Sequence, residues 1–191
     1  MGVEEMEEEK TNLLKSSAHS QDEKIKLELE TRGQNENNRW LQERKLRVTA
    51  SNFGLISKRL QRSKWATVVK QLLYSKVSND ATLYGQLHEP AAINVFQEME
   101  EIQVQPCGLF VDKEHDFLAA SPDGLVGGDN LIEVKCSKSA ENLTISEAVI
   151  KVKSFCLEKL RCGNVRLKKK HNYYYQVQGQ LHVAEKKSVI L

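Results

Sequence analysis

A short turn and the strand that follows it constrain this chain more than any other feature of its sequence. Ser121-Pro122-Asp123-Gly124 is typical of a turn, and Ile132-Glu133-Val134-Lys135, which begins nine residues after that aspartate, is typical of a strand. Because side chains alternate along a strand, Glu133 and Lys135 are predicted to share one face, while Val134 points the other way, into a core. Two carboxylates and an amine are therefore expected to converge.

These residue types suit the chemistry of a metal-dependent nuclease. Mg²⁺ prefers oxygen ligands, so Asp123 and Glu133 are candidate ligands, with substrate phosphate and water completing the coordination. A bound ion polarises a phosphate and lowers the pKa of its water, which a nearby amine such as Lys135 can orient or deprotonate. The alternative interpretation is an ordinary hairpin turn followed by an exposed Glu-x-Lys strand, because both patterns are common.

Further blocks of sequence accompany this motif in a fixed order. They are Trp40 with Arg44 through Ser51, Tyr84-Gly85-Gln86-Leu87-His88-Glu89, and Tyr175-Gln176-Val177-Gln178. Together with Ala120 to Gly124 and Glu133 to Cys136, they span most of residues 40–184. In these blocks the chain resembles the YqaJ-type viral recombinase nucleases, which are similar to phage lambda exonuclease and belong to the PD-(D/E)XK nuclease superfamily.

The resemblance implies an α/β fold with a restriction-endonuclease-like core, in which helices flank a mixed central β-sheet. It implies that Asp123 and Glu133 bind metal together with the backbone carbonyl of Val134. Lys135 would be the catalytic amine, and Glu89 a further carboxylate of the metal site, acting directly or through water. The cofactor implied is Mg²⁺, with Mn²⁺ as an alternative ion.

The resemblance also implies residues that contact the rest of the substrate. Gln176 matches a glutamine that lines the active site on a returning helix. Arg44, Ser51 and Ser121 match a site for the 5′-phosphate of DNA, a role that suits arginine because its planar fork makes paired hydrogen bonds to phosphate. Thr49-Ala50-Ser51 also fits a helix N-cap, and the two interpretations are compatible because a capped helix N-terminus attracts anions.

The activity implied is that of a metal-dependent DNA exonuclease, digesting one strand of duplex DNA from a 5′-phosphorylated end in recombination or repair. The partners implied are double-stranded DNA ends, a single-strand annealing protein and further copies of the chain. The alternative is a catalytically inactive or truncated DNA-binding module, domesticated from a phage or mobile element. A third interpretation is a structural protein with a coincidental motif, which predicts no DNA affinity beyond that of any basic surface.

Two segments differ in composition from the rest of the chain. Residues 1–38 are rich in Glu, Lys, Asn, Gln and Ser, which predicts a disordered tail or a solvated helix ahead of a nuclease domain at 39–191. Residues 151–170 carry eight Lys or Arg side chains against Glu158 alone, although the net charge of the chain is only +2. This basic segment predicts either sequence-independent attraction to phosphates or an ordinary solvated surface.

Periodicity gives a coarse secondary structure. Apolar spacing predicts helices over residues 39–60, 63–76, 84–101 and a returning helix through 174–181. Strand character is found over residues 102–112, 116–121 and 131–136, with a turn at 127–130. The second helix is expected to bury a stripe that includes Trp65 and Val69, and the third to bury Leu87 and Val95, with Pro90 in its first turn. The sequential strands predict a meander, incomplete at its carboxyl end because few residues follow Gln176.

The cysteines and the hydropathy pattern bear on the compartment. The cysteines form neither a C-x-x-C pair nor a zinc pattern with histidine, which favours reduced thiols at Cys107, Cys136, Cys156 and Cys162. No apolar run approaches the about 20 residues that span a bilayer, and the chain shows no secretion signal. The chain is therefore expected to be intracellular, without a membrane partner, and nuclear if its host is eukaryotic.

Overall fold

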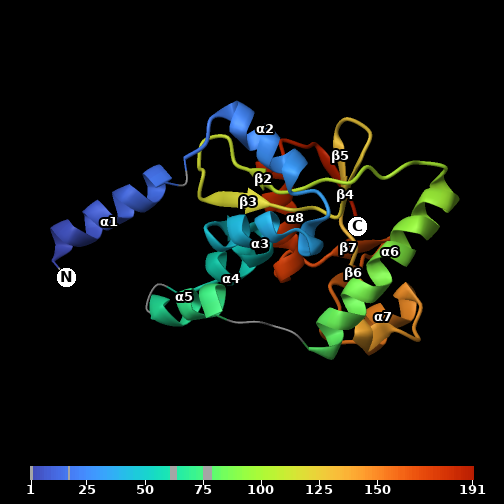
Figure 1. Ribbon diagram of the computed structural model, residues 1–191. Coiled ribbons are helices and arrows are strands. Elements are labelled where there is room, and N and C mark those ends of the chain that lie inside the picture. Colours follow the sequence, from blue (N-terminus) through green and yellow to red (C-terminus); the bar gives the residue numbers. More distant parts are fainter. Residues whose placement is uncertain (1, 17, 61–63, 75–78) are drawn as a thin grey trace.

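Two small mixed sheets lie among the helices in the computed structural model (Figure 1). The structure describes every residue except 1, 17, 61–63 and 75–78. The first sheet has the order β1-β3-β2 and consists of β1 (Val48–Thr49), β3 (Leu118–Ala120) and β2 (Phe110–Val111). In it, β1 runs parallel to β3 and β2 runs antiparallel to β3.

The second sheet has the order β4-β5-β8 and consists of β4 (Gly124–Val126), β5 (Asn130–Ile132) and β8 (Ser188–Ile190). β4 and β5 form a hairpin through the predicted turn, where Gly127 has a φ of 63°, a conformation that suits glycine. β8 pairs in parallel with β5, and the ladder continues one residue further because the Glu133 N–H donates to the Ile190 carbonyl over 2.9 Å.

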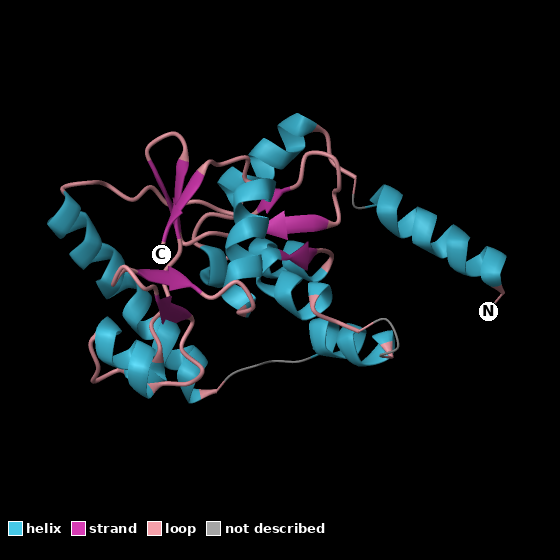
Figure 2. Cartoon of the chain, turned by 180° about the vertical axis from the view of Figure 1, so that it is seen from behind, coloured by secondary structure: helices cyan, strands magenta, loops and turns pink. Residues whose placement is uncertain are grey.

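Helices surround both sheets (Figure 2). They are α1 (Val3–Ser16), α2 (Gln21–Glu30), α3 (Asn38–Lys45), α4 (Phe53–Ser57), α5 (Trp65–Tyr74), α6 (Asp80–Glu100), α7 (Ile145–Lys151) and α8 (Asn172–Val183). Short 3-10 turns are η1 (Gln34–Glu36), η2 (Ala50–Asn52) and η3 (Lys138–Ala140), and a hairpin is formed by β6 (Leu157–Lys159) and β7 (Val165–Leu167). The architecture is the predicted α/β arrangement.

The returning helix α8 packs against β3, η2 and α4, as its apolar spacing predicted. Glycines at two crossing points allow this close approach. A Cβ on Gly179 would lie 2.4 Å from the Phe53 ring, and a Cβ on Gly54 would lie 2.9 Å from the Asn172 Cα. Side chains at these points would push α8 away from α4 and η2, so the glycines set how closely this helix packs on these two elements.

The segment before residue 39 does not lie wholly outside the core, contrary to the prediction. α1 extends away from the body of the protein as an exposed helix (Figures 1 and 2), but α2 packs on β2. Leu27 is fully buried in a cluster with Leu109, Val111 and Ala119, and the Leu109 N–H donates to the Thr31 hydroxyl over 2.8 Å. Composition missed this element because one buried leucine and buried polar contacts of Lys24 and Glu28, not an apolar stripe, anchor it.

The helix predicted over residues 39–60 is interrupted by β1. Val48 and Thr49 are β-branched and favour a strand, and the Val48 N–H donates to the Phe117 carbonyl over 2.8 Å. The predicted meander is also wrong, because β3 and β5, which overlap the second and third predicted strands, belong to different sheets. The chain crosses from one sheet to the other between Ala120 and Gly124, which is where the predicted turn motif lies.

α6 begins earlier than its apolar pattern predicted. The Asn79 side chain accepts a 2.9 Å hydrogen bond from the Thr82 N–H and caps the helix, so Pro90 lies in the interior rather than in the first turn. Pro90 removes the bond that would reach the Gln86 carbonyl, and both residues are exposed, so water can replace that bond. The predicted burial of Leu87 is wrong as well, because it is 76% exposed.

α5 confirms the second predicted helix within the described residues, but not the burial of its stripe. Val68 is 2% exposed, whereas Trp65 is 54% and Val69 48% exposed. Val95 on α6, also predicted to be buried, is 53% exposed. The apolar spacing therefore located these helices correctly but overestimated how many of their side chains the fold covers.

Candidate active site

Asp123 lies at the crossing between the two sheets. Its N–H donates to the Ile132 carbonyl over 3.1 Å, and its Oδ2 accepts a 2.6 Å hydrogen bond from the Val134 N–H. The Gln34 amide holds the preceding residue, because its Nε2 donates to the Pro122 carbonyl over 2.6 Å. The predicted turn and strand thus meet as expected, with the aspartate carboxylate bonded to the backbone of the strand segment.

Glu133 is the most enclosed carboxylate of this region, with 1% of its surface exposed. Its Oε1 accepts a 2.5 Å hydrogen bond from Gln176 Nε2 and forms an ion pair with Lys135. Its Oε2 accepts a 2.5 Å hydrogen bond from Gln180 Nε2. Both oxygens are therefore held by donors, and the ion pair shows that Glu133 and Lys135 share one side of the chain as predicted.

Gln180 was not predicted as a site residue. It lies four residues after Gln176 on α8, so both amides project from the same helix face toward Glu133. Gln180 is 1% exposed, and its Oε1 has no hydrogen-bond partner in the described part of the chain. Gln178, in contrast, is exposed, because residues two apart on a helix lie on different faces. The spacing of four residues was the signal that could have identified Gln180.

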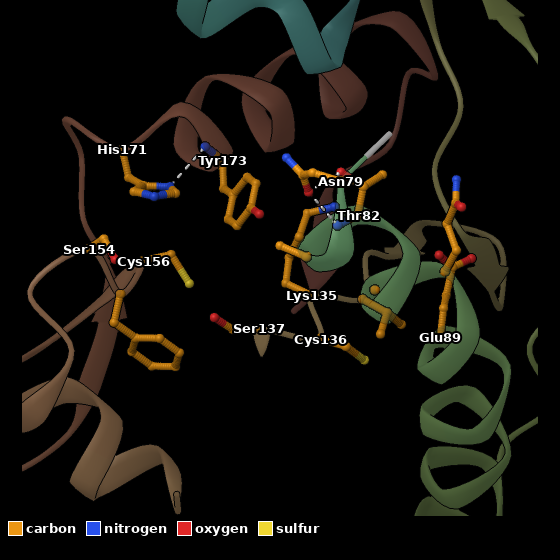
Figure 3. A pocket seen from close by; sticks show the side chains of 15 residues that line it. Asn79, Thr82, Glu89, Lys135, Cys136, Ser137, Ser154, Cys156, His171 and Tyr173 are labelled. Atoms are coloured by element: carbon orange, nitrogen blue, oxygen red, sulfur yellow. Dashed lines mark hydrogen bonds between the residues drawn. The ribbon is translucent and has the colours of Figure 1, made fainter. Parts of the chain in front are cut away.

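Lys135 lies in a cavity of about 480 Å³ beside Tyr173 (Figure 3). Its Nζ is 4.9 Å from the centroid of the Tyr173 ring, close enough for a cation–π contact. Burial alone would lower the pKa of Lys135, but the negative charges of Glu133 and Asp123 outweigh burial and raise it. In the metal-free protein Lys135 is therefore a cation that neutralises part of the carboxylate charge.

Glu89 lines two cavities at once. It faces the cavity of Lys135, and it faces a second cavity of about 320 Å³ together with Asp123 and Trp40. Burial raises the pKa of Glu89, an effect that Lys135 opposes and Glu133 reinforces. Glu89 projects from the middle of α6, not from the helix start where it was predicted, and still faces the carboxylates on the sheet side.

Asp123 is the most strongly perturbed acid of the site. Burial, reinforced by the negative charge of Glu133, raises its pKa to about 8, although Lys135 acts in the opposite direction. Crowded carboxylates in a low-dielectric site disfavour full ionisation, and a bound cation would relieve that penalty. The perturbation is typical of a functional site.

The donor set fits a hard divalent cation in part. Asp123, Glu133 and the carbonyl of Val134 offer the oxygen ligands that Mg²⁺ and Mn²⁺ accept, and the two carboxylates repel each other without a cation between them. Within the described residues, however, no three His, Cys, Asp or Glu side chains are gathered closely enough to hold an ion. Glu89 would have to approach, or act through water, to complete the set.

A second cluster surrounds Arg44. The Arg44 Nη1 and the Trp40 Nε1 both donate to the Ser121 hydroxyl, over 3.4 Å and 2.8 Å, and the guanidinium lies 4.2 Å from the centroid of the Trp40 ring. Burial lowers the pKa of Arg44 to about 10, against the charge of Glu133. Two of the three predicted phosphate ligands are thus together, whereas Ser51 is exposed and hydrogen-bonds to Thr49.

Two further findings concern the cysteines and the helices. Cys107, Cys136, Cys156 and Cys162 are all free thiols. In the part of the chain that the structure describes, no helix combines the length and the apolar character needed to cross a membrane.

The fold resembles that of a solved nuclease. An alkaline exonuclease (LHK-Exo) from Laribacter hongkongensis matches with a TM-score of 0.55 and 25% sequence identity, over 78% of this chain and 69% of that chain. LHK-Exo in complex with dAMP matches with a TM-score of 0.54 and 24% identity, over 76% of this chain and 67% of that chain. The architecture is therefore of the PD-(D/E)XK nuclease type.

A family model agrees with this fold class. The YqaJ-like viral recombinase domain matches residues 39–187, and the chain belongs to this family. The match includes every residue predicted for the site, although α2, which packs on the same core, lies ahead of it. No curated protein matches the chain.

Proposed function

We propose that this chain is a DNA exonuclease that acts in recombination and cleaves with a divalent metal ion at Asp123 and Glu133. Its family, YqaJ-like viral recombinase, and its likeness to an alkaline exonuclease support the activity. The observation that carries the metal site is the arrangement around Glu133, where a buried carboxylate lies beside Asp123 and Lys135 and is held by two amides. Mg²⁺ is the expected ion, with Mn²⁺ as its alternative.

Each side chain has a separate task in this mechanism. When bound, a divalent ion would polarise the scissile phosphate and lower the pKa of a water molecule. Gln176 and Gln180 each donate to one oxygen of Glu133 and so fix the orientation of its carboxylate. Lys135 orients the attacking water or takes part in its deprotonation. Glu89 supplies a further carboxylate from α6, directly or through water.

Recognition of the DNA end is assigned to the second cluster. The guanidinium of Arg44 has the Ser121 hydroxyl and the Trp40 ring as its contacts and no carboxylate ion pair within the described residues, so its charge is available to an anion. A terminal 5′-phosphate is the anion that suits it, because a guanidinium binds phosphate oxygens in pairs. Digestion would therefore start at a 5′-phosphorylated end of duplex DNA. Ser51, which hydrogen-bonds to Thr49, would add a hydroxyl contact to the same phosphate.

Digestion of a linear duplex tests this proposal. The duplex is labelled separately at its two ends, prepared with and without 5′-phosphate, and incubated with the protein in Mg²⁺, in Mn²⁺ and in EDTA. We expect metal-dependent release of the 5′-terminal nucleotide, faster from phosphorylated ends and absent from a Glu133→Ala variant. DNA binding without nucleotide release in either metal would contradict the proposal and identify a DNA-binding module. Addition of a single-strand annealing protein and a measurement of mass in solution would test the expected partner and self-association.

A further inference from the structure

The β6–β7 hairpin lies in the long segment between Lys135 and Gln176. Its strands pair antiparallel, with Glu158 opposite Arg166. The connecting residues 160–164 are closed by a 2.7 Å hydrogen bond from the Leu160 N–H to the Asn164 carbonyl. The hairpin is a defined, closed ribbon.

Both ends of this hairpin are fixed to the catalytic cavity. Phe155 and Cys156, just before β6, line the same cavity as Lys135, and so does His171, just after β7. Lys168 ties the two sides together, because its N–H donates to the Cys156 carbonyl over 2.8 Å and its Nζ to the Phe155 carbonyl over 2.7 Å. A polymer bound along the hairpin would therefore be held at a set position relative to the cavity.

Apart from Lys168, whose Nζ donates to backbone carbonyls, the cations of this segment fall into two groups. Lys151 pairs with Glu147 over 2.9 Å, and Arg166 pairs with Glu158 over 2.7 Å, so these charges are compensated locally. The other group is exposed and has no carboxylate ion pair within the described residues; it consists of Lys153, Lys159, Arg161, Lys169 and Lys170. Uncompensated cations beside a cavity attract a polyanion from solution.

We propose that the β6–β7 hairpin and its flanking lysines grip the phosphate backbone of the duplex that leads into the catalytic cavity. This proposal rests on the proposed function for the identity of the polymer. It adds a surface that binds the DNA at some distance from the phosphate that is cleaved. Contacts to phosphates fix position without reading sequence, which suits an enzyme that must move along any DNA. These contacts would chiefly increase the affinity for duplex DNA. Cleavage itself would be carried out by the residues around Glu133.

The test compares two triple variants that each remove three positive charges. The first is Lys159→Gln, Arg161→Gln and Lys169→Gln in the hairpin segment. The matched control is Lys26→Gln, Lys113→Gln and Lys187→Gln, three exposed lysines on other elements that pair with Glu30, Glu185 and Asp129. Affinity for a 30-base-pair duplex is measured in EDTA over a range of salt concentrations, and nucleotide release is measured in Mg²⁺ at saturating DNA.

We expect the hairpin variant to lose about 2 to 3 units from the slope of log affinity against log salt, because each lost phosphate contact removes about 0.9. Its KM should rise about tenfold or more, while kcat changes by less than about twofold and thermal unfolding is unaltered. The control should keep the slope of the parent. An unchanged slope in the hairpin variant, or a loss of kcat at saturating DNA, would overturn the proposal. Parent protein that binds DNA but releases no nucleotide would instead contradict the proposed function.

Discussion

The two polar clusters of the site are organised in opposite ways. Around Glu133, three donors hold one buried carboxylate, namely Gln176, Gln180 and Lys135. Around Arg44, within the described residues, the guanidinium has one hydroxyl as hydrogen-bond partner and an aromatic ring beside it. The first cluster is rich in internal contacts, and the second keeps donors that no described residue uses. Under the proposed function, the protein therefore fixes the Glu133 carboxylate before substrate binds and leaves the Arg44 guanidinium for a ligand.

The difference also separates the tasks that a substitution can damage. Loss of a group that contacts Glu133 should affect the chemical step or metal binding, because these groups position the carboxylate even before substrate binds. Loss of Arg44 should affect only DNA ends that carry a phosphate, since that is where its unused donors are needed. The following substitutions test this difference between the two clusters.

Lys135→Ala should have the largest effect. We expect kcat for nucleotide release to fall by about 10² to 10⁴, because a positioned proton-transfer group contributes on that order, while duplex affinity changes little. Lys138→Ala is the matched control, three residues further on, where the lysine is exposed and paired with Glu141. A Lys135→Ala protein that cuts at the parent rate would remove the lysine from the mechanism.

Arg44→Lys should have the next largest effect. The substitution retains a positive charge but loses the fork, so kcat/KM for 5′-phosphorylated duplex should fall about 10- to 100-fold, as expected for a charged hydrogen bond of about 1.5–3 kcal/mol. The rate on 5′-hydroxyl ends should stay the same. Arg39→Lys, an exposed arginine on α3 that pairs with Glu30, serves as the control. Equal losses on both kinds of end would show that Arg44 does not recognise the phosphate.

Gln180→Leu should weaken the site more mildly. Residues that orient a metal ligand typically contribute about 10- to 100-fold to metal affinity or activity, and we expect the lower end because Gln176 still holds Glu133. Titration of Mn²⁺ by calorimetry and the Mg²⁺ dependence of nucleotide release would both report it. Gln178→Leu changes the same residue type on the exposed face of α8. Similar metal affinities for the two variants would show that Gln180 only fills space.

Asp123→Asn should give the smallest effect, on stability in EDTA. In the unfolded chain the Asp123 carboxyl has its usual pKa of 3.8 and loses its proton at low pH. In the folded protein, burial and the charge of Glu133 raise the pKa of Asp123 to about 8. The folded acid therefore costs increasing stability as pH rises from about 4 to about 8. The amide avoids this cost, so the variant should gain on the order of 1–2 kcal/mol over the parent at pH 8 and less at pH 5. Thermal unfolding at both pH values measures the gain, and a difference that does not grow with pH would contradict the raised pKa.

Local patterns predicted that Asp123, Glu133 and Lys135 would converge, and their catalytic roles stay a prediction. Asp123 lies in the predicted turn and Glu133 and Lys135 follow directly after β5, so the turn and the alternation along an extended chain were enough to bring them together. Gln176 was predicted from the resemblance. Gln180 was missed, because its contact with Glu133 depends on how α8 packs against segments that are distant in the chain.

The parts that sequence reasoning predicted wrongly depend on contacts between distant segments. Leu27 enters the core because β2 lies beside α2, and nothing in its neighbourhood indicates this. The strand at Val48 exists because β3 offers a partner seventy residues away in the chain. Pro90 was misplaced because the Asn79 cap starts α6 earlier than its apolar pattern does.

The most direct measurement is a structure of the protein with Ca²⁺ and a 5′-phosphorylated duplex end, since Ca²⁺ takes the same oxygen ligands as Mg²⁺. We expect an ion within about 2.3–2.6 Å of carboxylate oxygens from Asp123 and Glu133. We also expect the terminal phosphate within hydrogen-bond distance of Arg44 and Ser121. An ion bound elsewhere, or a DNA end held away from Arg44, would contradict the division between a prepared catalytic carboxylate and an open end-binding arginine.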